Sequence, residues 1–217
     1  INQLAPKVRQ RVLEQYRDHY QLHNQWWDQV YEDAQHVAYR LGFGLIDISF
    51  SGFWTQGSGA SFTGQWDSNQ YDKPRKDEEP ISKYESFLEA VKDYAPEDEK
   101  LHAIAQDMDN VVAIDPSYAN GNMTANITRS NSRYSHSDTM DIEVDLIITI
   151  YGPDTSAWSN DTQEITELSR TEYKFLHDAD KSLRECIKAF ANWIYRQLEQ
   201  EHKHLTSDET LLEHLED

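Results

Sequence analysis

The chain has 217 residues, of which 39 are acidic and 20 are basic, so its formal net charge is −19. Aromatic residues make up 12% of the chain, which excludes a disordered protein because disordered chains are poor in aromatic residues. A surface this negative repels nucleic acid and anionic membranes and favours basic partners. We therefore expect one folded domain over residues 1–217, with no direct nucleic-acid binding.

The sequence contains no apolar run long enough to cross a membrane. Its single cysteine, Cys186, cannot form an internal disulfide and lies in a helical pattern. Such cysteine usage is typical of a protein kept in a reducing cytosol. We therefore expect a cytoplasmic protein without membrane association.

Two helices are predicted at the start of the chain. Apolar residues recur at near-helical spacing from Val8 to Tyr20, and again from Trp26 to Leu41. Gly42 and Gly44 follow the second pattern, and glycine commonly ends a helix.

Residues 46–66 predict a β-hairpin. Ile46, Ile48, Phe50 and Trp54 alternate along its first strand, and the return strand repeats this pattern at residues 60, 62, 64 and 66. The connecting residues 55–59 contain two glycines, which suit a short hairpin loop. By this alternation, Trp54 faces the core and Phe53 points away from it.

Polar loops and two further helices are predicted in the middle of the chain. Residues 67–80 contain two prolines and mixed charges, which predicts a loop. Residues 81–94 predict a short amphipathic helix, and Pro96 opens another with acidic residues in its first turn, where the helix dipole favours them.

The second half of the chain predicts three strands and a long helix. Strands are expected at residues 111–114, 123–127 and 140–150, with an Asn120-Gly121 turn between the first two. Residues 131–138 and 153–163 are predicted loops, residues 171–204 predict one long helix, and residues 206–209 cap a last short one. Strands grouped between helices predict the α+β class, with an antiparallel β-sheet packed against long helices.

Four segments together resemble a family of bacteriophage and prophage proteins. The core is FSGFWTQGSGASF at residues 50–62, and similar segments lie at residues 26–33, 133–140 and 193–209. Members of the family sometimes carry an antitoxin label. Because they are encoded by phages and prophages, the resemblance implies that the protein acts in the cytoplasm of an infected host bacterium. Ser58 stands where many relatives have an acidic residue, which argues against a metal or an acid catalyst in this loop.

The candidate site consists of two polar loops that lie inside these segments. Arg133 offers a planar donor fork for a phosphate or carboxylate, Gln56 offers one donor and one acceptor, and an aromatic ring could stack on a planar group. We expect both loops to border one concave surface that binds a ligand or partner, through Phe53, Trp54, Gln56, Ser58, Arg133, Tyr134 and His136.

Two chemical alternatives compete with binding. His136 lies beside Ser135, Ser137 and Asp138 and could perform acid–base chemistry, although triad members usually meet through folding rather than as sequence neighbours. Carboxylates alternate at residues 141, 143 and 145 and could bind a divalent cation, although a solvated strand face is the preferred interpretation. The chain has no zinc or phosphate-loop motif, and we expect no metal and no cofactor.

These observations favour a non-enzymatic binding protein of phage origin that neutralises a host defence or toxin component. Its partner would be a host bacterial protein or a small polar ligand such as a nucleotide. One alternative is an acidic DNA mimic that inhibits a nucleic-acid-binding host protein. Another is a small enzyme acting on a nucleotide or a phosphorylated substrate. The aromatic content also suggests a homodimer.

Overall fold

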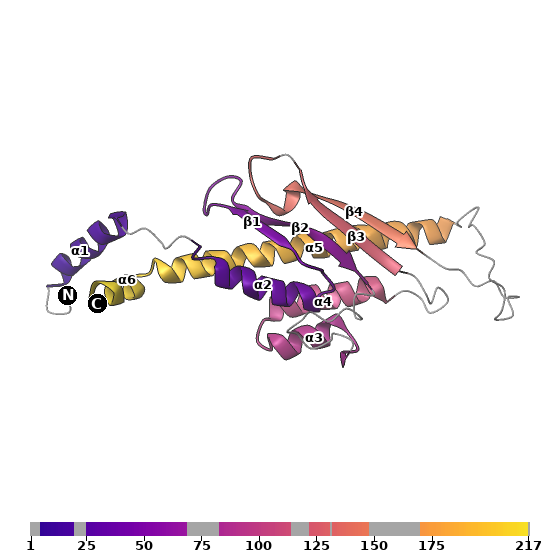
Figure 1. Ribbon diagram of the computed structural model, residues 1–217, viewed down its shortest axis with the longest axis horizontal. Coiled ribbons are helices and arrows are strands. Elements are labelled where there is room, and N and C mark those ends of the chain that lie inside the picture. Colours follow the sequence, from indigo (N-terminus) through magenta and orange to yellow (C-terminus); the bar gives the residue numbers. More distant parts are fainter. Residues whose placement is uncertain are drawn as a thin grey trace, which may run out of the picture.

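A computed structural model describes residues 5–19, 25–68, 83–113, 122–130, 132–147 and 170–216. Six α-helices and four strands are defined within these ranges (Figure 1). The helices are α1 (Pro6–His19), α2 (Asp28–Arg40), α3 (Phe87–Tyr94), α4 (Glu99–Val112), α5 (Arg170–Leu205) and α6 (Asp208–Glu216). The strands are β1 (Asp47–Ser51), β2 (Gly59–Asp67), β3 (Asn122–Arg129) and β4 (Met140–Ile147), and a 3-10 turn, η4 (Ser137–Thr139), precedes β4.

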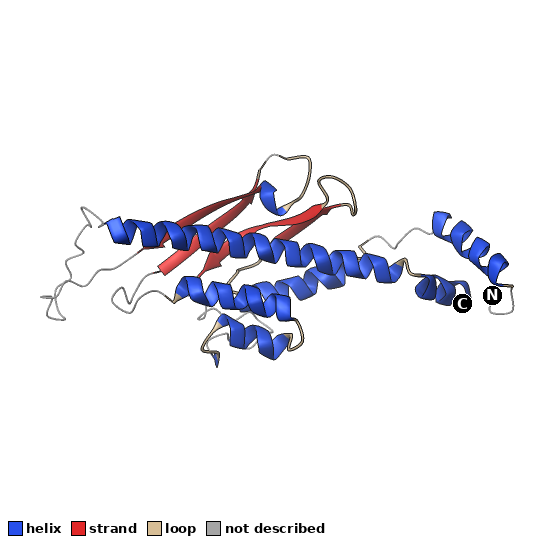
Figure 2. Cartoon of the chain, turned by 180° about the vertical axis from the view of Figure 1, so that it is seen from behind, coloured by secondary structure: helices blue, strands red, loops and turns tan. Residues whose placement is uncertain are grey.

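The four strands form one antiparallel sheet in the order β1-β2-β3-β4. The register places Ile48 of β1 opposite Phe62 of β2, and it aligns Gly64 of β2 with Ile127 of β3 and Ile142 of β4. These side chains share the face along which α5 runs (Figures 1 and 2). The predicted α+β class, with an antiparallel sheet packed against a long helix, is therefore confirmed.

Helix α5 supplies the apolar surface that covers the sheet. It has 36 residues and so spans about 54 Å at the α-helical rise. The rings of Phe43, Phe62 and Phe190 meet at the centre of the core with centroids 5.4 to 5.6 Å apart. Each ring comes from a different segment of the chain, so this cluster joins the end of α2, the sheet and α5. The α5 stripe continues through other fully buried side chains: Leu183, Ile187, Ile194 and Leu198.

Backbone and side-chain hydrogen bonds fix the C-terminal end of α2 and the N-terminal end of α4. Gly42 has φ +84°, and the amide of Phe43 donates to the Ala38 carbonyl, which is the bond pattern of a Schellman end to α2. Asp98 caps α4 by accepting from the Leu101 amide at 2.9 Å, and its second oxygen accepts from the indole of Trp193 on α5 at 2.7 Å. The same carboxylate therefore caps the start of α4 and holds this helix against α5.

The predicted strand at residues 111–114 is wrong for the residues that the structure describes. Val111 and Val112 form the last turn of α4. Val111 is buried and continues the apolar stripe of Leu101, Ile104 and Met108 at helical spacing. A short β-branched run fits either a strand or a buried helix end, and here the helical stripe decides.

Several predicted features lie outside the described residues. These are the loop at residues 153–163, most of the loop at residues 67–80, the Asn120-Gly121 turn and the last three residues of the 140–150 strand. At the two ends of the described chain, α1 packs on α6, where Leu13 and Leu211 are buried and Arg17 pairs with Asp208.

Truncation of the central ring should test this core. We expect Phe190→Ala to lower the free energy of unfolding by about 3–5 kcal/mol, because it leaves a cavity beside Phe43 and Phe62. Lys203→Ala, an exposed change on the same helix, should alter stability by no more than about 0.5 kcal/mol. Denaturant titration measures both, and equal losses would contradict the proposed core.

Candidate functional site

The loop after β1 places Phe53 and Trp54 in the opposite sense to the predicted one. Strand β1 ends at Ser51, and Gly52 and Trp54 then adopt positive φ values of 52° and 57°. The period-two alternation stops there because it holds only for an extended backbone. As a result, Phe53 turns onto the core and Trp54 turns outward. The prediction that Trp54 faces the core is therefore wrong.

Phe53 sits in a cluster of aromatic rings at the end of the sheet. Its ring centroid lies 5.6 Å from Phe50, 5.7 Å from Tyr195, 6.1 Å from Trp26 and 4.7 Å from the imidazole of His202. These neighbours come from β1, from α5 and from the segment before α2, so the loop is fixed from behind by three parts of the chain. Phe53 acts as an anchor for the loop.

Trp54 remains 67% exposed although its indole rests on this cluster, with centroids 5.6 Å from both Phe53 and His202. A left-handed φ is uncommon for a large side chain and is held only where the surroundings determine it. The fold therefore supports an exposed tryptophan in a conformation that tryptophan rarely adopts.

The turn that follows brings Gln56 to the tip of the hairpin. The Ser58 amide donates to the Thr55 carbonyl, and the Ser58 hydroxyl accepts from the Thr55 amide at 3.0 Å. Ser58 thus closes the turn, whereas the Gln56 side chain is exposed. Of these two predicted site residues, Gln56 alone is available to a ligand.

The second predicted loop lies directly against the first. The Ser51 hydroxyl oxygen is 2.8 Å from the Gly57 carbonyl oxygen and 3.0 Å from that of Ser135, and it accepts from the Ser135 amide at 3.1 Å. A hydroxyl has one proton, so it donates to one of these carbonyls at a time. Ser51 therefore joins residues 52–58 to residues 132–136; we call these two segments the paired loops.

Two glycines permit this contact. A Cβ atom added at Gly57 would lie 2.9 Å from Cγ of Tyr134, and one added at Gly59 would lie 2.6 Å from Cδ2 of His136. Both distances are too short for a side chain without movement of the ring. The glycines of the FSGFWTQGSGASF segment therefore allow a tyrosine and a histidine from the other loop to rest on the hairpin backbone.

His136 has a structural task in its loop. Its Nδ1 accepts the Asp138 amide at 3.1 Å, and its own amide donates to the Thr139 hydroxyl at 3.1 Å, which completes a capping box before η4. Asp138 Oδ2 lies 3.6 Å from the same Nδ1, and this contact is an ion pair only when the imidazole is protonated. That carboxylate also bonds to Lys188 of α5 at 2.8 Å, which lowers the pKa of Asp138. These bonds place Nδ1 of His136 and the Asp138 carboxylate in contacts that hold the loop together.

Arg133 and Tyr134 complete the exposed part of the paired loops. Tyr134 is 48% exposed, and the Arg133 guanidinium lies 6.0 Å from the centroid of its ring. The available groups are therefore Trp54, Gln56, Arg133 and the outer side of Tyr134. Phe53, Ser58 and His136 support them from within.

His202 belongs to this site but was not among the predicted site residues. Its imidazole lies between Trp26, Phe53 and Trp54, and burial lowers its pKa below the ordinary value. Its Nδ1 is buried and has no hydrogen-bond partner in the part of the chain that the structure describes. The sequence signal was its spacing, since His202 follows Leu198 by four residues on the buried stripe of α5.

The next feature is the set of carboxylates on β4, which the sequence offered as a possible divalent-cation site. Asp141, Glu143 and Asp145 are exposed on β4, and no group of three metal-binding side chains is found within the described ranges. Cavities are lined by residues of α4 and α5, of β4 and α5, and of α2 and α5, and these cavities include no residue of the paired loops. No described helix is both long and apolar enough to cross a membrane.

Comparison with known proteins places the chain in a family. A family model described as "Domain of unknown function (DUF8835)" matches residues 26–208, and the chain belongs to this family. No curated protein and no solved structure matches it. The matched range includes the whole sheet, both paired loops and α5, whereas α1 and all but the first residue of α6 lie outside it.

Substitution of one loop glycine should loosen the paired loops. Gly52 and Gly57 both have positive φ, so alanine should strain either position by about 1–2 kcal/mol. Only Gly57 faces the Tyr134 ring, because nothing lies within 4 Å of a Cβ atom at Gly52. We expect Gly57→Ala to destabilise the protein more than the matched control Gly52→Ala in denaturant titration. Equal losses would contradict the packing of Tyr134 on Gly57.

The buried imidazole of His202 should make stability depend on pH. Burial lowers its pKa in the folded state, so the unfolded state binds more protons below the ordinary histidine pKa of about 6.5. Stability should therefore be fully present above that pH and decrease as the pH falls through it. We expect His202→Gln to flatten this decrease, measured by urea titration at several pH values. His177 is exposed on the same helix, so His177→Gln should keep the loss of stability at low pH. Identical pH profiles for both variants would contradict the assignment of this loss to His202.

Proposed function

We propose that this protein acts by binding a partner protein, without catalysis, and that the paired loops are its docking surface. The observation that carries the proposal is Trp54, which is 67% exposed, has a left-handed backbone and rests on a buried aromatic cluster. Strained backbone and exposed large aromatics both concentrate at sites of recognition. Because the Trp54 side chain is 67% exposed, burial of its ring does not explain why the backbone adopts this strained conformation.

The surroundings of Trp54 resemble the centre of a protein interface. Tyr134 and Arg133 lie on the neighbouring loop, and tryptophan, tyrosine and arginine are the residues most enriched among interface hot spots. The bonds of Ser51 and the anchoring of Phe53 hold these side chains in place before a partner arrives. Such preorganisation lowers the entropic cost of binding.

A protein partner fits this surface better than a small ligand does. The cavities described above are lined by residues outside the paired loops, and Trp54 and Tyr134 are exposed, which supports a protein partner. The net charge of −19 favours a partner with a basic surface. The resemblance to phage and prophage proteins supports a host defence or toxin component as that partner.

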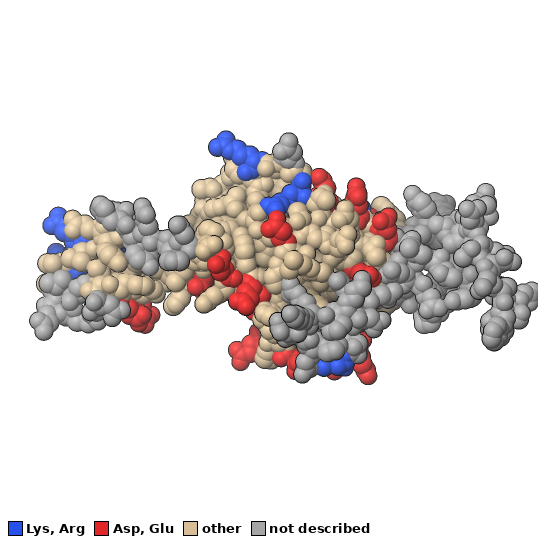
Figure 3. Space-filling view, in the orientation of Figure 1, with Lys and Arg blue, Asp and Glu red and all other residues tan. Residues whose placement is uncertain are grey.

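Mimicry of DNA finds less support than a local docking surface. A mimic needs acidic side chains in a continuous array at roughly phosphate spacing. On the face in Figure 3, acidic residues form separate groups over α2, over the end of β4 and over α3, with basic residues between some of them. Asp47, for example, is paired with Arg129 on this sheet.

A capture experiment with matched variants tests the proposal. Tagged protein would be incubated with bacterial lysate prepared with and without phage infection, and each captured protein would be purified for affinity measurement. We expect Trp54→Ala with Tyr134→Ala to weaken the complex by about 2 kcal/mol or more, which is about thirtyfold in Kd. The melting temperature should change far less than in Phe190→Ala, because Trp54 is 67% exposed and Tyr134 is 48% exposed.

Leu45→Ala is the matched control, since Leu45 is another large apolar side chain, 75% exposed and outside the paired loops. It should leave the affinity unchanged. A partner that binds the Trp54 and Tyr134 double variant as tightly as the parent protein would contradict the proposed docking surface. If complex formation protected other amides from hydrogen exchange and left residues 52–58 unprotected, that result would also contradict the proposed docking surface.

A further inference from the structure

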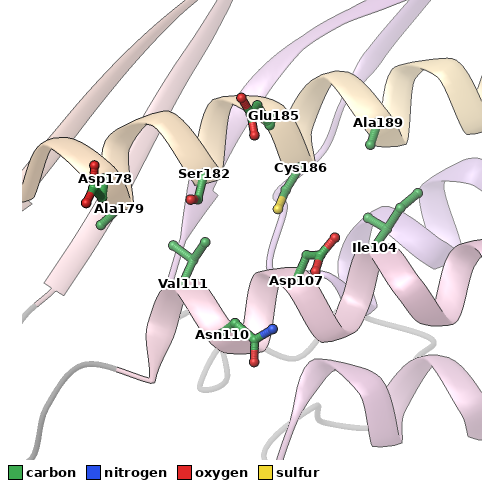
Figure 4. A pocket seen from close by; sticks show the side chains of 10 residues that line it. All are labelled: Ile104, Asp107, Asn110, Val111, Asp178, Ala179, Ser182, Glu185, Cys186 and Ala189. Carbon is green, nitrogen blue, oxygen red and sulfur yellow. The ribbon is translucent and has the colours of Figure 1, made fainter. Parts of the chain in front are cut away.

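A groove between α4 and α5 has no task in the proposed docking surface and shares no residue with the paired loops. Its volume is about 540 Å³, within the range of small-molecule sites. Four of the α5 side chains that line the hollow over three turns are small: Ala179, Ser182, Cys186 and Ala189 (Figure 4). Ile104 and Val111 of α4 form the opposite apolar wall.

The groove carries negative charge and no positive charge. Asp107 of α4 and Asp178 and Glu185 of α5 line it, and none of its ten lining residues is basic. Lys181 lies 3.9 Å from Glu185, but both side chains are mostly exposed, so this pair is weak. Asp107 and Asp178 have no ion pair within the described residues.

A buried polar group points into the same space. Cys186 is 5% exposed, and its thiol is directed between the two helices (Figure 4). The thiol is free of any disulfide, and a backbone hydrogen bond is the smallest of the influences on its pKa. Burial, and then the carboxylates of Asp107 and Glu185, raise the pKa of the thiol to about 12, so the thiol stays neutral.

We propose that this groove binds a small aliphatic amine, with its alkyl chain on the apolar walls and its ammonium groups on the carboxylates of Asp107 and Asp178. An alkyl chain matches Ile104, Val111 and the small side chains of α5. An ammonium group supplies the positive charge that the lining lacks, and the neutral thiol of Cys186 offers a soft acceptor beside it. The site is independent of the docking surface, so either proposal can fail without the other.

The test uses the full chain at physiological ionic strength, with hexane-1,6-diamine as the probe and hexane-1,6-diol as its uncharged analogue. Backbone amide shifts in NMR titrations would locate binding. We expect saturable shifts for the diamine that are confined to the two helices around Ser182 and Cys186, and none for the diol. Shifts spread over the whole acidic surface, or no saturable shift, would overturn the proposal.

Two pairs of substitutions separate a built site from general attraction by a protein of charge −19. Asp107→Asn with Asp178→Asn should weaken diamine binding at least about fivefold, since two ion pairs are lost. Glu32→Gln with Asp145→Asn removes the same charge from exposed positions outside the groove and should leave the affinity unchanged. Equal weakening by both pairs would overturn the proposal.

A steric variant keeps the charges and fills the space. Ser182 is exposed at the mouth of the groove, so leucine is tolerated by the helix and projects into the hollow. Ser182→Leu should abolish the diamine-induced shifts while the thermal unfolding curve is retained. Persistence of the same shifts in this variant would show that the diamine binds elsewhere.

Discussion

Burial of one face of α5 is the interaction on which the rest of the molecule depends. Phe190 meets the core rings of Phe43 and Phe62, and further along the same helix Tyr195 and His202 hold Phe53. Lys188, two residues before Phe190, bonds to Asp138 beside the second loop. A rotation or shift of this helix would therefore move the core and the supports of both paired loops together.

The paired loops depend on small side chains as much as on large ones. Gly57 and Gly59 leave room for Tyr134 and His136 to rest on the hairpin, and the short side chain of Ser51 bonds to both loops. Polar residues that look reactive in the sequence, such as His136 and Ser58, are occupied by turn and cap hydrogen bonds. The outward side chains are Trp54, Tyr134, Arg133 and Gln56, and the first three are of the types enriched in protein interfaces.

The sequence was most informative where apolar residues repeat regularly. Alternation along β2 and β4 and the stripe of α5 predicted the sheet, its covered face and the fold class, because burial enforces these periods. The period-two alternation gave the wrong orientation for Trp54, because a local sequence pattern does not predict a tryptophan with positive φ. The predicted strand at Val111 was also wrong, because a short apolar run suits two structures. The proximity of the two loops was expected from their places at strand ends, but the contacts that join them depend on tertiary packing.

The central claim is that the paired loops form one preorganised unit in the free protein. Native-state hydrogen exchange at the Ser135 amide tests it most directly, because this amide donates across the two loops to the Ser51 hydroxyl. The account predicts that the amide exchanges far more slowly than an unstructured loop does, and that Ser51→Ala removes this protection while the core amides of α5 keep theirs. Exchange of Ser135 at the rate of an open loop in the parent protein would contradict the claim.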